Sequence, residues 1–353
     1  MKVAAAIYQN IIEGWDLEVS IAGSKQKSEA VNEKQFTVAS LFAGIGGICC
    51  AFQDAGCKIE WANERDPYAC KTYRNFMKNT TLIEKDIREI MNYEIPPFDI
   101  LVAGFPCQPF SLAGHRKGFE DPRGKLFDEI IRILDKGPRA VFLENVGSLK
   151  SHNNGETLEY IESMIKSKGY VIKNCVMNTK DYGNLPQFRN RIYFVAFKNK
   201  TDMDNFTFPE KIELIKPLNI IIKRDIQQDS RLYYSLRNAK HYDVFESEMI
   251  KKDTVYQWRR VYVRENKSNV CPTLTANMGI GGHNVPIVRD DYGIRKLSLR
   301  ECLDLQGFPE SFEFPKIPDG QKYKEIGNSV SVPVVRAIAE KMICAMEKTD
   351  MGV

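Results

Sequence analysis

The chain has 353 residues and a formal net charge of +4, with 43% hydrophobic and 27% charged residues. These proportions are typical of a globular protein and exclude a disordered or fibrous chain. The length is sufficient for one large and one smaller domain, each with its own hydrophobic core.

The N-terminal region, residues 1–35, is expected to be an extension without a catalytic role. A short helix is predicted around residues 8–15, and the polar stretch GSKQKSEAVNEKQ that follows is typical of a linker. Polar residues interrupt MKVAAAIYQN before it reaches the length of a signal-peptide core, and no apolar run approaches the about 20 residues that cross a membrane. We therefore expect a cytoplasmic protein.

Between residues 36 and 198, short apolar runs alternate with helix-like segments. Strands are predicted at 36–42, 58–61, 99–105, 139–144, 170–176 and 191–197, and helices at 67–77, 125–134 and 157–166. This alternation predicts an α/β fold with a doubly wound, Rossmann-like sheet. No convincing helix separates the last two strands, so the sheet is expected to be mixed, with an antiparallel edge.

A second, smaller domain is predicted for residues 199–295, where the segments become short, irregular and rich in aromatic and charged residues. Residues 211–268 carry 13 lysines and arginines against 8 aspartates and glutamates. This positive excess favours binding of a polyanion, with an ordinary solvated surface as the alternative. Residues 296–353 are predicted to return to the first domain, with helices at 298–305 and 333–346.

The glycine-rich segment FAGIGG, residues 42–47, follows the first predicted strand. Gly44 and Gly46 match the start of the dinucleotide-binding pattern G-x-G-x-x-G, but Cys49 takes the place of the third glycine. Glu64 follows about 20 residues later, at the end of the next strand, where a carboxylate can accept hydrogen bonds from ribose hydroxyls. The segment therefore favours an adenosine ligand without a pyrophosphate, such as S-adenosyl-L-methionine, over NAD. Close packing of strand and helix is the alternative use of such glycines.

Cys107 is the candidate nucleophile. It follows an apolar strand in DILVAGFPCQPFS, and the prolines on either side restrict the backbone around it. Because the carboxyl end of a strand faces the ligand crevice in such sheets, the thiol is expected to be displayed there. The next apolar strand ends at Glu144, whose carboxyl group is a candidate for acid–base work on the atom under attack.

The other eight cysteines are expected to be mostly small buried residues. The nine cysteines of the chain are odd in number and scattered, they include no C-x-x-C pair, and only four histidines are present. This pattern supports neither a zinc site nor a disulfide framework, and no metal is expected.

Five ordered motifs resemble those of the DNA cytosine-5 methyltransferases, in particular the bacterial restriction–modification type. They are FAGIGG (42–47), GFPCQPFS (104–111), ENV (144–146), QFRNR (187–191) and GNSV (327–330). The resemblance covers about residues 36–345. It leaves mainly the N-terminal extension and the middle of the second domain unmatched.

The resemblance implies transfer of a methyl group from S-adenosyl-L-methionine to carbon 5 of a cytosine in double-stranded DNA. Carbon 5 is a poor nucleophile, so the Cys107 thiolate first adds to carbon 6 while Glu144 stabilises charge at ring nitrogen 3. Loss of the carbon-5 proton, to a base that the sequence does not reveal, then expels Cys107. The cytosine must be flipped out of the duplex to be reached. A monomeric enzyme of the bacterial nucleoid is implied.

The resemblance also implies a cofactor pocket and two arginines at the catalytic centre. Arg189 and Arg191 alternate along an extended segment and are expected to contact the cytosine or to organise the loop around the thiol. A pair of surface arginines is the alternative, chiefly for Arg189. Arg65 stands where some relatives have an aromatic residue, so the stacking of adenine is not predicted. The expected cofactor-binding residues are Phe42, Gly44, Gly46, Gly47, Glu64, Asp86, Ile87, Leu126, Asn328 and Val330.

Two regions are expected to contact DNA. Residues 111–124, glycine-rich and charged, are predicted to be a mobile loop that closes over the duplex, with a disordered surface loop as the alternative. Residues 256–267 and 273–284, in a target-recognition domain, are predicted to read the base sequence, which itself is not predicted. The expected DNA-binding residues are Gln108, Ser111, His115, Arg116, Lys117, Arg259, Arg260, Arg264, Thr275, Gly281 and Gly282.

Three other functions remain open at this point. A tRNA cytosine-5 methyltransferase would use the same chemistry, as one branch of the family does, but the basic second domain favours DNA. A catalytically silent DNA-binding relative would not need both Cys107 and Glu144. An NAD-dependent oxidoreductase would need the missing third glycine and a hydride-transfer site.

Overall fold

The computed structural model describes residues 35–352, except residues 106–124, 238, 260 and 280–283. The predicted helix around residues 8–15 and the predicted mobile loop at 111–124 lie outside the described residues. No helix within the described ranges is long and apolar enough to cross a membrane.

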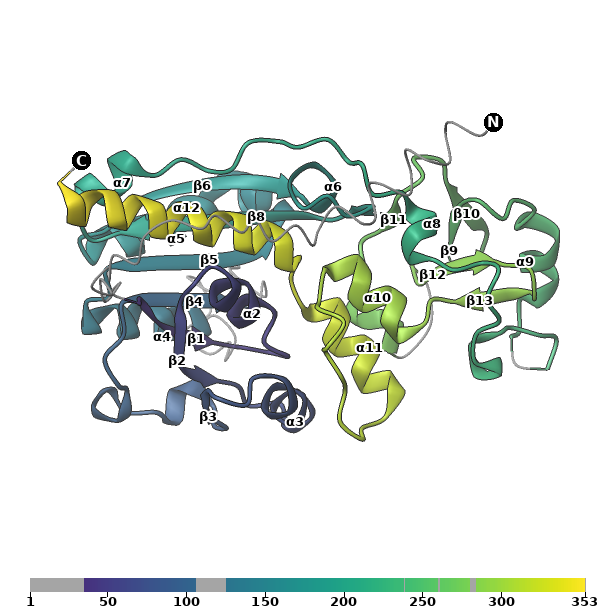
Figure 1. Cartoon of the computed structure of the whole chain (residues 1–353), viewed down its shortest axis with the longest axis horizontal. Coiled ribbons are helices and arrows are strands. Elements are labelled where there is room, and N and C mark those ends of the chain that lie inside the picture. The colour runs from purple at the N-terminus through teal and green to yellow at the C-terminus, as the bar shows by residue number, and fades with distance from the viewer. Residues whose placement is uncertain (1–34, 106–124, 238, 260, 280–283, 353) are drawn as a thin grey trace, which may run out of the picture. The chain divides into compact units, whose positions relative to one another are not determined.

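A mixed sheet forms the centre of the larger lobe, as the sequence predicts, and it has seven strands, one more than expected (Figure 1). All its neighbouring strands are parallel except those beside β8, which pairs antiparallel with both β5 and β6. The strands, in their order across the sheet, are β3 (Thr81–Ile83), β2 (Lys58–Asn63), β1 (Thr37–Leu41), β4 (Ile100–Gly104), β5 (Ala140–Val146), β8 (Asn190–Phe197) and β6 (Val171–Asn178). The predicted antiparallel edge is therefore confirmed, and the short edge strand β3 is an addition.

Helices cover both faces of this sheet, which explains why its central strands are almost continuously apolar. On β1, Val38 packs with helices α2 (Gly47–Asp54) and α12 (Val332–Met351), and Leu41 packs on the opposite face with α4 (Lys125–Ile133) and α5 (Glu156–Ser167). Helix α3 (Pro67–Phe76) begins at a proline after Asp66, whose carboxylate accepts hydrogen bonds from the first backbone N–H groups.

Strand β1 lies beside β4 in the sheet, and the chain leaves β1 toward β2 but leaves β4 toward β5, on the opposite side. A crevice opens at the carboxyl ends of the strands at such a point, and ligands of open α/β sheets bind there. The first glycine turn, which follows β1, and the segment that leads to Cys107, which follows β4, both start at this edge.

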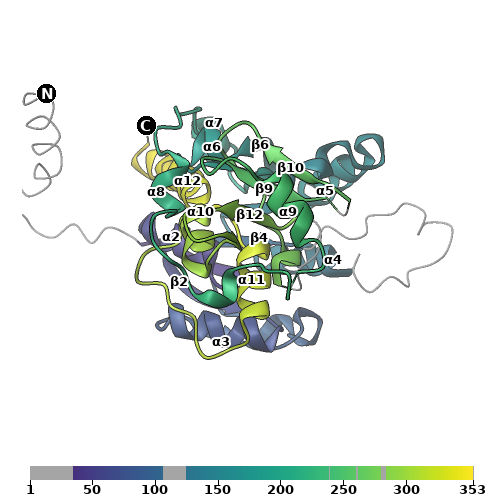
Figure 2. The ribbon, with the colours of Figure 1, turned by 90° about the vertical axis from the view of Figure 1, so that its right-hand side faces the viewer.

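The smaller lobe contains a four-stranded antiparallel sheet, where the sequence predicts only irregular segments. Its order is β10 (Val263–Asn266), β9 (Val255–Trp258), β12 (Pro286–Arg289) and β13 (Ile294–Lys296). Figure 2 shows helix α9 (Tyr242–Glu248) against this sheet, where Phe245 packs on Tyr256 and Ile287. Strands of three or four residues are too short for a clear alternation of apolar and polar positions, so the sequence does not reveal them.

Arg295 of β13 joins the smaller sheet to the C-terminal helices. The buried guanidinium pairs with Asp290 at 2.6 Å and with Glu301 of α10 (Leu299–Gln306) at 2.8 Å. Removing one partner of such a buried pair would leave an uncompensated charge, which costs several kcal/mol. Helix α10 itself begins with a capping box between Ser298 and Glu301.

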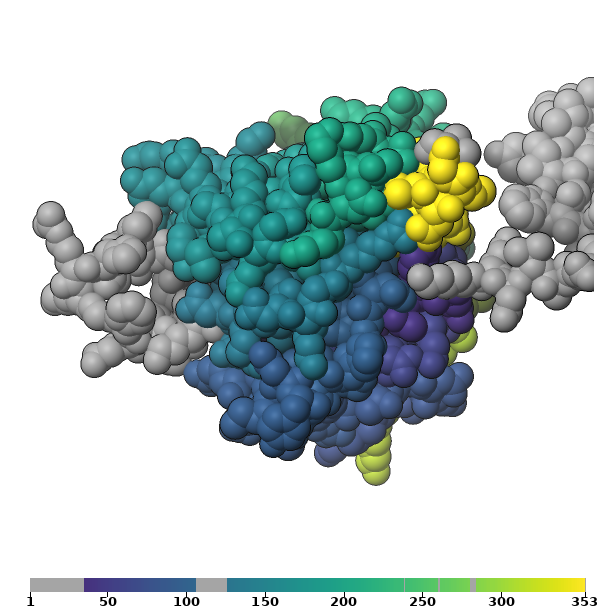
Figure 3. Space-filling view, turned by 90° about the vertical axis from the view of Figure 1, so that its left-hand side faces the viewer, coloured from purple at the N-terminus to yellow at the C-terminus, as the bar shows by residue number. Residues whose placement is uncertain are grey.

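The C-terminal segment contains helices α11 (Asp319–Asn328) and α12, which pack on different parts of the chain. Helix α11, which the sequence does not predict, packs against η7 (Ala276–Gly279). A Cβ on Gly327 would come within 2.1 Å of the Thr275 carbonyl carbon, so only glycine permits this contact. Helix α12 then lies against α2 and α7 (Lys200–Asn205). In Figure 3 the yellow end of α12 touches the purple start of the described chain.

Shorter elements complete the described chain. They are η1 (Ile87–Glu89), η2 (Asn92–Glu94), η4 (Leu134–Lys136), η5 (Gly147–Gly155), α6 (Thr179–Tyr182), β7 (Gln187–Phe188), α8 (Leu218–Ile221), η6 (Ser230–Leu232) and β11 (Cys271–Pro272). Strands β7 and β11 pair in parallel and tie the two lobes together.

Most of the cysteines are buried, as predicted. Among the described residues, Cys49, Cys50, Cys57, Cys70, Cys271 and Cys302 are buried and Cys175 is half-buried, whereas Cys344 is exposed on α12. Cys344 is the exposed exception, which a prediction of mostly buried cysteines allows. Burial raises the pKa of Cys50 and Cys57 to about 12, which keeps both thiols protonated and unreactive at neutral pH.

Candidate active site

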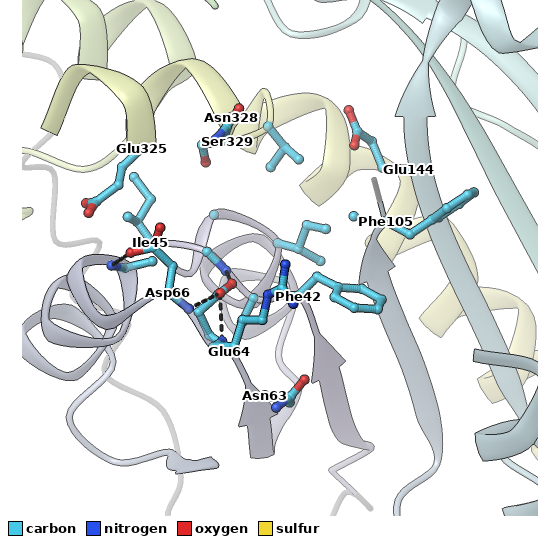
Figure 4. Close-up of a pocket in the computed structure, with 18 of the residues that line it drawn as sticks. Phe42, Ile45, Asn63, Glu64, Asp66, Phe105, Glu144, Glu325, Asn328 and Ser329 are labelled. Carbon is cyan, nitrogen blue, oxygen red and sulfur yellow. Dashed lines mark hydrogen bonds between the residues drawn. The ribbon is translucent and has the colours of Figure 1, made fainter. Parts of the chain in front are cut away.

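A pocket of about 430 Å³ opens at the carboxyl ends of β1, β2, β4 and β5 (Figure 4). Residues from the C-terminal segment, including Glu325 and Asn328, close it from the other side. Nine of the ten residues expected to bind the cofactor line this pocket: Phe42, Gly44, Gly47, Glu64, Asp86, Ile87, Leu126, Asn328 and Val330.

Gly46 is not among the described residues that line the pocket. Its φ of +87° is left-handed, and a Cβ there would lie 2.9 Å from Met77 Cγ, so the residue serves the packing of the turn on α3. Gly47 allows a different close approach, because a Cβ would lie 2.6 Å from Ser329 Oγ of the C-terminal segment. Gly44, with φ of +56°, has open space where a Cβ would be.

The Glu64 carboxylate is fixed by three backbone N–H groups. Its Oε2 accepts from Gly44 at 2.9 Å, and its Oε1 accepts from Arg65 and Asp66 at 2.8 Å each. These bonds hold the carboxylate at the pocket wall without exhausting the acceptor capacity of Oε2. The arrangement fits a ribose, because an oriented carboxylate can accept a further hydrogen bond from a sugar hydroxyl.

The pocket is apolar beside the turn after β1, where Phe42, Ile87 and Leu126 line it. Such a surface fits an adenine ring. Arg65 is directed to Asp86, with Nη1 and Oδ2 2.8 Å apart. Hydrogen bonds from Arg88, and then from Arg65, lower the pKa of the Asp86 carboxyl group, so it is ionised at the pocket rim.

Glu144 lies two residues before the end of β5 and is 8% exposed. Its Oε1 is 2.9 Å from Nε of Arg191 on the neighbouring strand β8. Gly104, the last residue of β4, pairs with Glu144 in the sheet, and a Cβ on it would lie 3.6 Å from Glu144 Oε2. Asn145 donates a hydrogen bond to the Phe105 carbonyl at 3.0 Å. The chain that leads to Cys107 therefore passes directly beside the Glu144 carboxylate.

Arg189 is 1% exposed, so the alternative of a surface arginine is wrong for this residue. Its guanidinium donates to the carbonyls of Leu274 at 2.8 Å, of Gly327 at 3.3 Å, and of Ser329. Burial, and secondarily the Arg191 cation, lower the pKa of Arg189 to about 9, which leaves it charged at neutral pH. Arg189 thus joins the smaller lobe and the C-terminal segment at the back of the pocket.

Cys107 lies outside the described residues. So do most of the predicted DNA-binding residues, namely Gln108, Ser111, His115, Arg116, Lys117, Arg260, Gly281 and Gly282. Of the others, Arg264 is exposed on β10, and Arg259 is half-buried at the end of β9, where its N–H closes a turn with the Tyr262 carbonyl. The Thr275 hydroxyl is buried where its backbone packs on Gly327.

The structure adds pocket residues that the sequence reasoning missed. Asn63, at the end of β2, donates to the carbonyls of Ile83 and Lys85 and so fixes the loop before Asp86. Lys324, Glu325 and Ser329 enter from α11 and the residues after it. Asn63 has a recognisable signal, a polar residue that ends an apolar strand, whereas the other three depend on the return of a distant segment.

The fold and the pocket define the class of this protein. A doubly wound mixed sheet with an antiparallel strand beside its last edge, a glycine turn after β1 and an acidic residue after β2 characterise a Rossmann-like methyltransferase. The described residues include no group of three or more His, Cys, Asp or Glu that could hold a metal ion.

Comparison with known proteins defines the family. The model of the C-5 cytosine-specific DNA methylases matches residues 36–344, and the chain belongs to this family. It is 49% identical over 312 residues to the type II methyltransferase M.Bsp6I of Bacillus sp. (strain RFL6), covering 88% of this chain and 99% of that protein. It is 36% identical over 330 residues to the type II methyltransferase M.HhaI of Haemophilus parahaemolyticus, covering 88% and 95%. The predicted DNA cytosine-5 methyltransferase is confirmed.

Solved structures show the same fold. The crystal structure of a Spodoptera frugiperda DNMT2 variant superimposes with a TM-score of 0.68 at 20% identity, covering 88% of this chain and all of that one. The S. pombe Dnmt2 methyltransferase gives a TM-score of 0.67 at 20% identity, covering 90% and 100%. At this level of identity the likeness concerns the fold alone, and the alternative functions gain no support from it.

Proposed function

We propose that the enzyme methylates cytosine at a specific short sequence of double-stranded DNA, with S-adenosyl-L-methionine as the methyl donor and Cys107 as the nucleophile. The observation that carries the proposal is that Glu64 and Glu144 line the same pocket, beside the strand that leads to Cys107. It combines a wall suited to adenosine with a carboxyl group suited to acid–base work on the base.

The residues of the chain would divide the reaction between them. The Cys107 thiolate forms a bond to carbon 6 of the flipped cytosine, which makes carbon 5 nucleophilic. Glu144 donates a hydrogen bond or proton at ring nitrogen 3, and Arg191, 2.9 Å away, holds its carboxyl group in place. When bound, S-adenosyl-L-methionine supplies an electrophilic methyl group. Phe42, Glu64 and Asn328 would hold it, and loss of the carbon-5 proton would restore the ring and release the thiol.

We infer a division of labour among the parts of the chain. Residues 36–198 would carry the catalytic and cofactor-binding functions, residues 199–295 target recognition, and residues 296–353 the return to the catalytic domain. The exposed Arg264 and the positive excess of residues 211–268 support contact between the smaller lobe and DNA phosphates. A monomer is expected, since one chain brings all these parts together.

The relatives named type II methyltransferases support a role in a restriction–modification system. In that role, methylation at the recognised site would protect the host DNA from a partner nuclease, in the cytoplasm of a bacterium. The smaller lobe would determine which DNA sequence is recognised, and mapping of the methylated cytosines would identify that sequence.

The first test is to incubate the protein with methyl-labelled donor and, separately, with mixed-sequence duplex DNA and with total tRNA. Label is expected in the DNA alone, at cytosines within one short motif, as mapped by sequencing. Label only in tRNA would contradict the substrate while keeping the chemistry. Label in neither would favour a silent DNA-binding relative.

Replacing Glu64 by alanine is expected to weaken binding of S-adenosylhomocysteine, the product of methyl loss, roughly 10- to 100-fold, because a hydrogen bond to a charged acceptor is lost. Isothermal titration calorimetry measures this change. Glu60→Ala on strand β2 is the matched control, because Glu60 forms an ion pair with the exposed Lys58 and is not among the described residues that line the pocket. An unchanged dissociation constant for Glu64→Ala would remove this residue from the ribose site.

A further inference from the structure

Two carboxyl groups of the pocket, Glu144 and Glu325, have a buried oxygen without a hydrogen-bond partner among the described residues, and only that of Glu144 lies beside an arginine in those residues. Glu325 lies in the last turn of α11, is 8% exposed and lines the pocket. Its Oε2 accepts a hydrogen bond from the Thr72 hydroxyl of α3 at 2.8 Å. Its Oε1 is buried and has no hydrogen-bond partner among the described residues. Since buried polar atoms are almost always paired, this oxygen marks a place where a ligand group is expected.

The surroundings of Glu325 favour a cationic group at that place. The charged side chains that face it are Asp66 before α3, Glu64 after β2 and Lys324 of α11. Lys324 is already paired with Asp66, with Nζ and Oδ2 2.9 Å apart. Burial, opposed by the Thr72 hydrogen bond, raises the pKa of Glu325 to about 7, and the neighbouring carboxylates contribute to the rise. The local charge is therefore negative whenever Glu325 is ionised.

The position of Glu325 matches one end of the proposed methyl donor. Figure 4 shows Glu325 and Asp66 on one side of the pocket, and Phe42, Phe105 and Glu144 on the other. With the adenine beside Phe42 and the ribose at Glu64, the amino-acid arm of the donor would extend to the polar side. That arm carries a carboxylate and an ammonium group, which is protonated at neutral pH.

We propose that Glu325 is a further cofactor-binding residue, whose free Oε1 accepts a hydrogen bond from the α-ammonium group of the methyl donor. The inference rests on the proposed function. A bound cation stabilises the ionised carboxyl group, so binding near pH 7 releases protons from those molecules in which Glu325 is protonated. Affinity then declines as the pH falls through the pKa of Glu325 in the free protein, because the carboxyl group must lose its proton to bind.

Calorimetry with S-adenosylhomocysteine tests this without turnover. At pH 7, titrations in two buffers of different ionisation enthalpy are expected to show release of a fraction of a proton by the wild type. Glu325→Gln is expected to bind about tenfold more weakly, because a charge-assisted hydrogen bond becomes a neutral one, and to release none. The glutamine keeps the shape and can still accept from Thr72, so α11 keeps its contact with α3.

Two controls separate ligand contact from a structural role. Glu340→Gln, on the exposed part of α12 where Glu340 pairs with Arg336, is expected to leave affinity and proton release unchanged. An analogue of S-adenosylhomocysteine with hydrogen in place of the amino group is expected to bind the wild type and Glu325→Gln equally. An equal loss for both ligands would overturn the inference and assign Glu325 a structural role.

The outcomes also distinguish this inference from the proposed function. Equal affinity and equal proton release for the wild type and Glu325→Gln would overturn the inference, while binding itself would uphold the cofactor. No binding of S-adenosylhomocysteine to the wild type would overturn the cofactor proposal. If Glu325→Gln unfolds, the proton release of the wild type still decides, because its absence at pH 7 contradicts an ionisation coupled to binding.

Discussion

Cys107→Ala is expected to lower the rate of DNA methylation by at least about 10⁴-fold, because carbon 5 of cytosine stays unreactive without a bond to carbon 6. The measurement is single-turnover transfer of labelled methyl groups to duplex DNA. Binding of S-adenosylhomocysteine is expected to stay unchanged, since the described residues that line the pocket, among them Phe42 and Glu64, are kept. Cys344→Ala is the matched control, because Cys344 is an exposed thiol on α12.

A covalent readout complements the rate. When the target cytosine of the duplex carries fluorine at carbon 5, methyl transfer from the donor leaves carbon 5 with fluorine and methyl but no proton, so the bond between Cys107 and carbon 6 cannot be broken by elimination. The wild type is expected to form a complex with such DNA that survives denaturing electrophoresis, and Cys107→Ala is expected to form none. Methylation by Cys107→Ala at a rate near that of the wild type would contradict the covalent mechanism.

Glu144→Gln is expected to slow methyl transfer by about 10²- to 10⁴-fold, the usual contribution of a positioned general acid or base. The glutamine has the same shape and can keep its place beside Arg191, whose Nε is 2.9 Å from Glu144 Oε1 in the wild type. The loss therefore reports the acid function rather than a collapse of the site. Single-turnover kinetics at saturating DNA and donor measure it.

Three control measurements test whether the loss of rate in Glu144→Gln comes from the acid function of Glu144. The melting temperature and the affinity for S-adenosylhomocysteine are expected to match those of the wild type. Glu156→Gln, in the first turn of α5 away from the pocket, is expected to have a normal rate. A rate for Glu144→Gln within about threefold of the wild type would assign the activation of the base to another residue.

Local sequence patterns were enough to predict the main strands of the larger sheet and the polar residues at the carboxyl ends of those strands. Strands β4 and β5 are buried on both faces, so ILVAG and AVFLENV are recognisable as strands, and the polar residues that end them are recognisable as site residues. Glu64 is placed by the same logic, at the end of β2. Each of these signals lies within a few neighbouring residues of the sequence.

Long-range pairing explains what could not be predicted. Helix α11 has the polar sequence DGQKYKEIGN, which lacks a clear apolar period, and it is held by contacts with η7 and α10. The burial of Arg189 depends on carbonyls 85 to 140 residues away along the chain. The orientation of the Glu325 carboxyl group depends on a hydrogen bond from Thr72, which is 253 residues away in the sequence. No pattern within a short window contains such partners.

The packing of α12 on α2 has a consequence for synthesis of the chain on the ribosome. Helix α2 begins at Gly47 and α12 at Val332, and ribosomes add about 5–20 residues per second. For roughly 15 to 60 s, one apolar face of the nascent sheet therefore lacks its cover, and the cofactor pocket lacks its C-terminal wall. Chains interrupted in that interval expose an aggregation-prone surface, which makes them clients of chaperones and proteases rather than partly active enzymes.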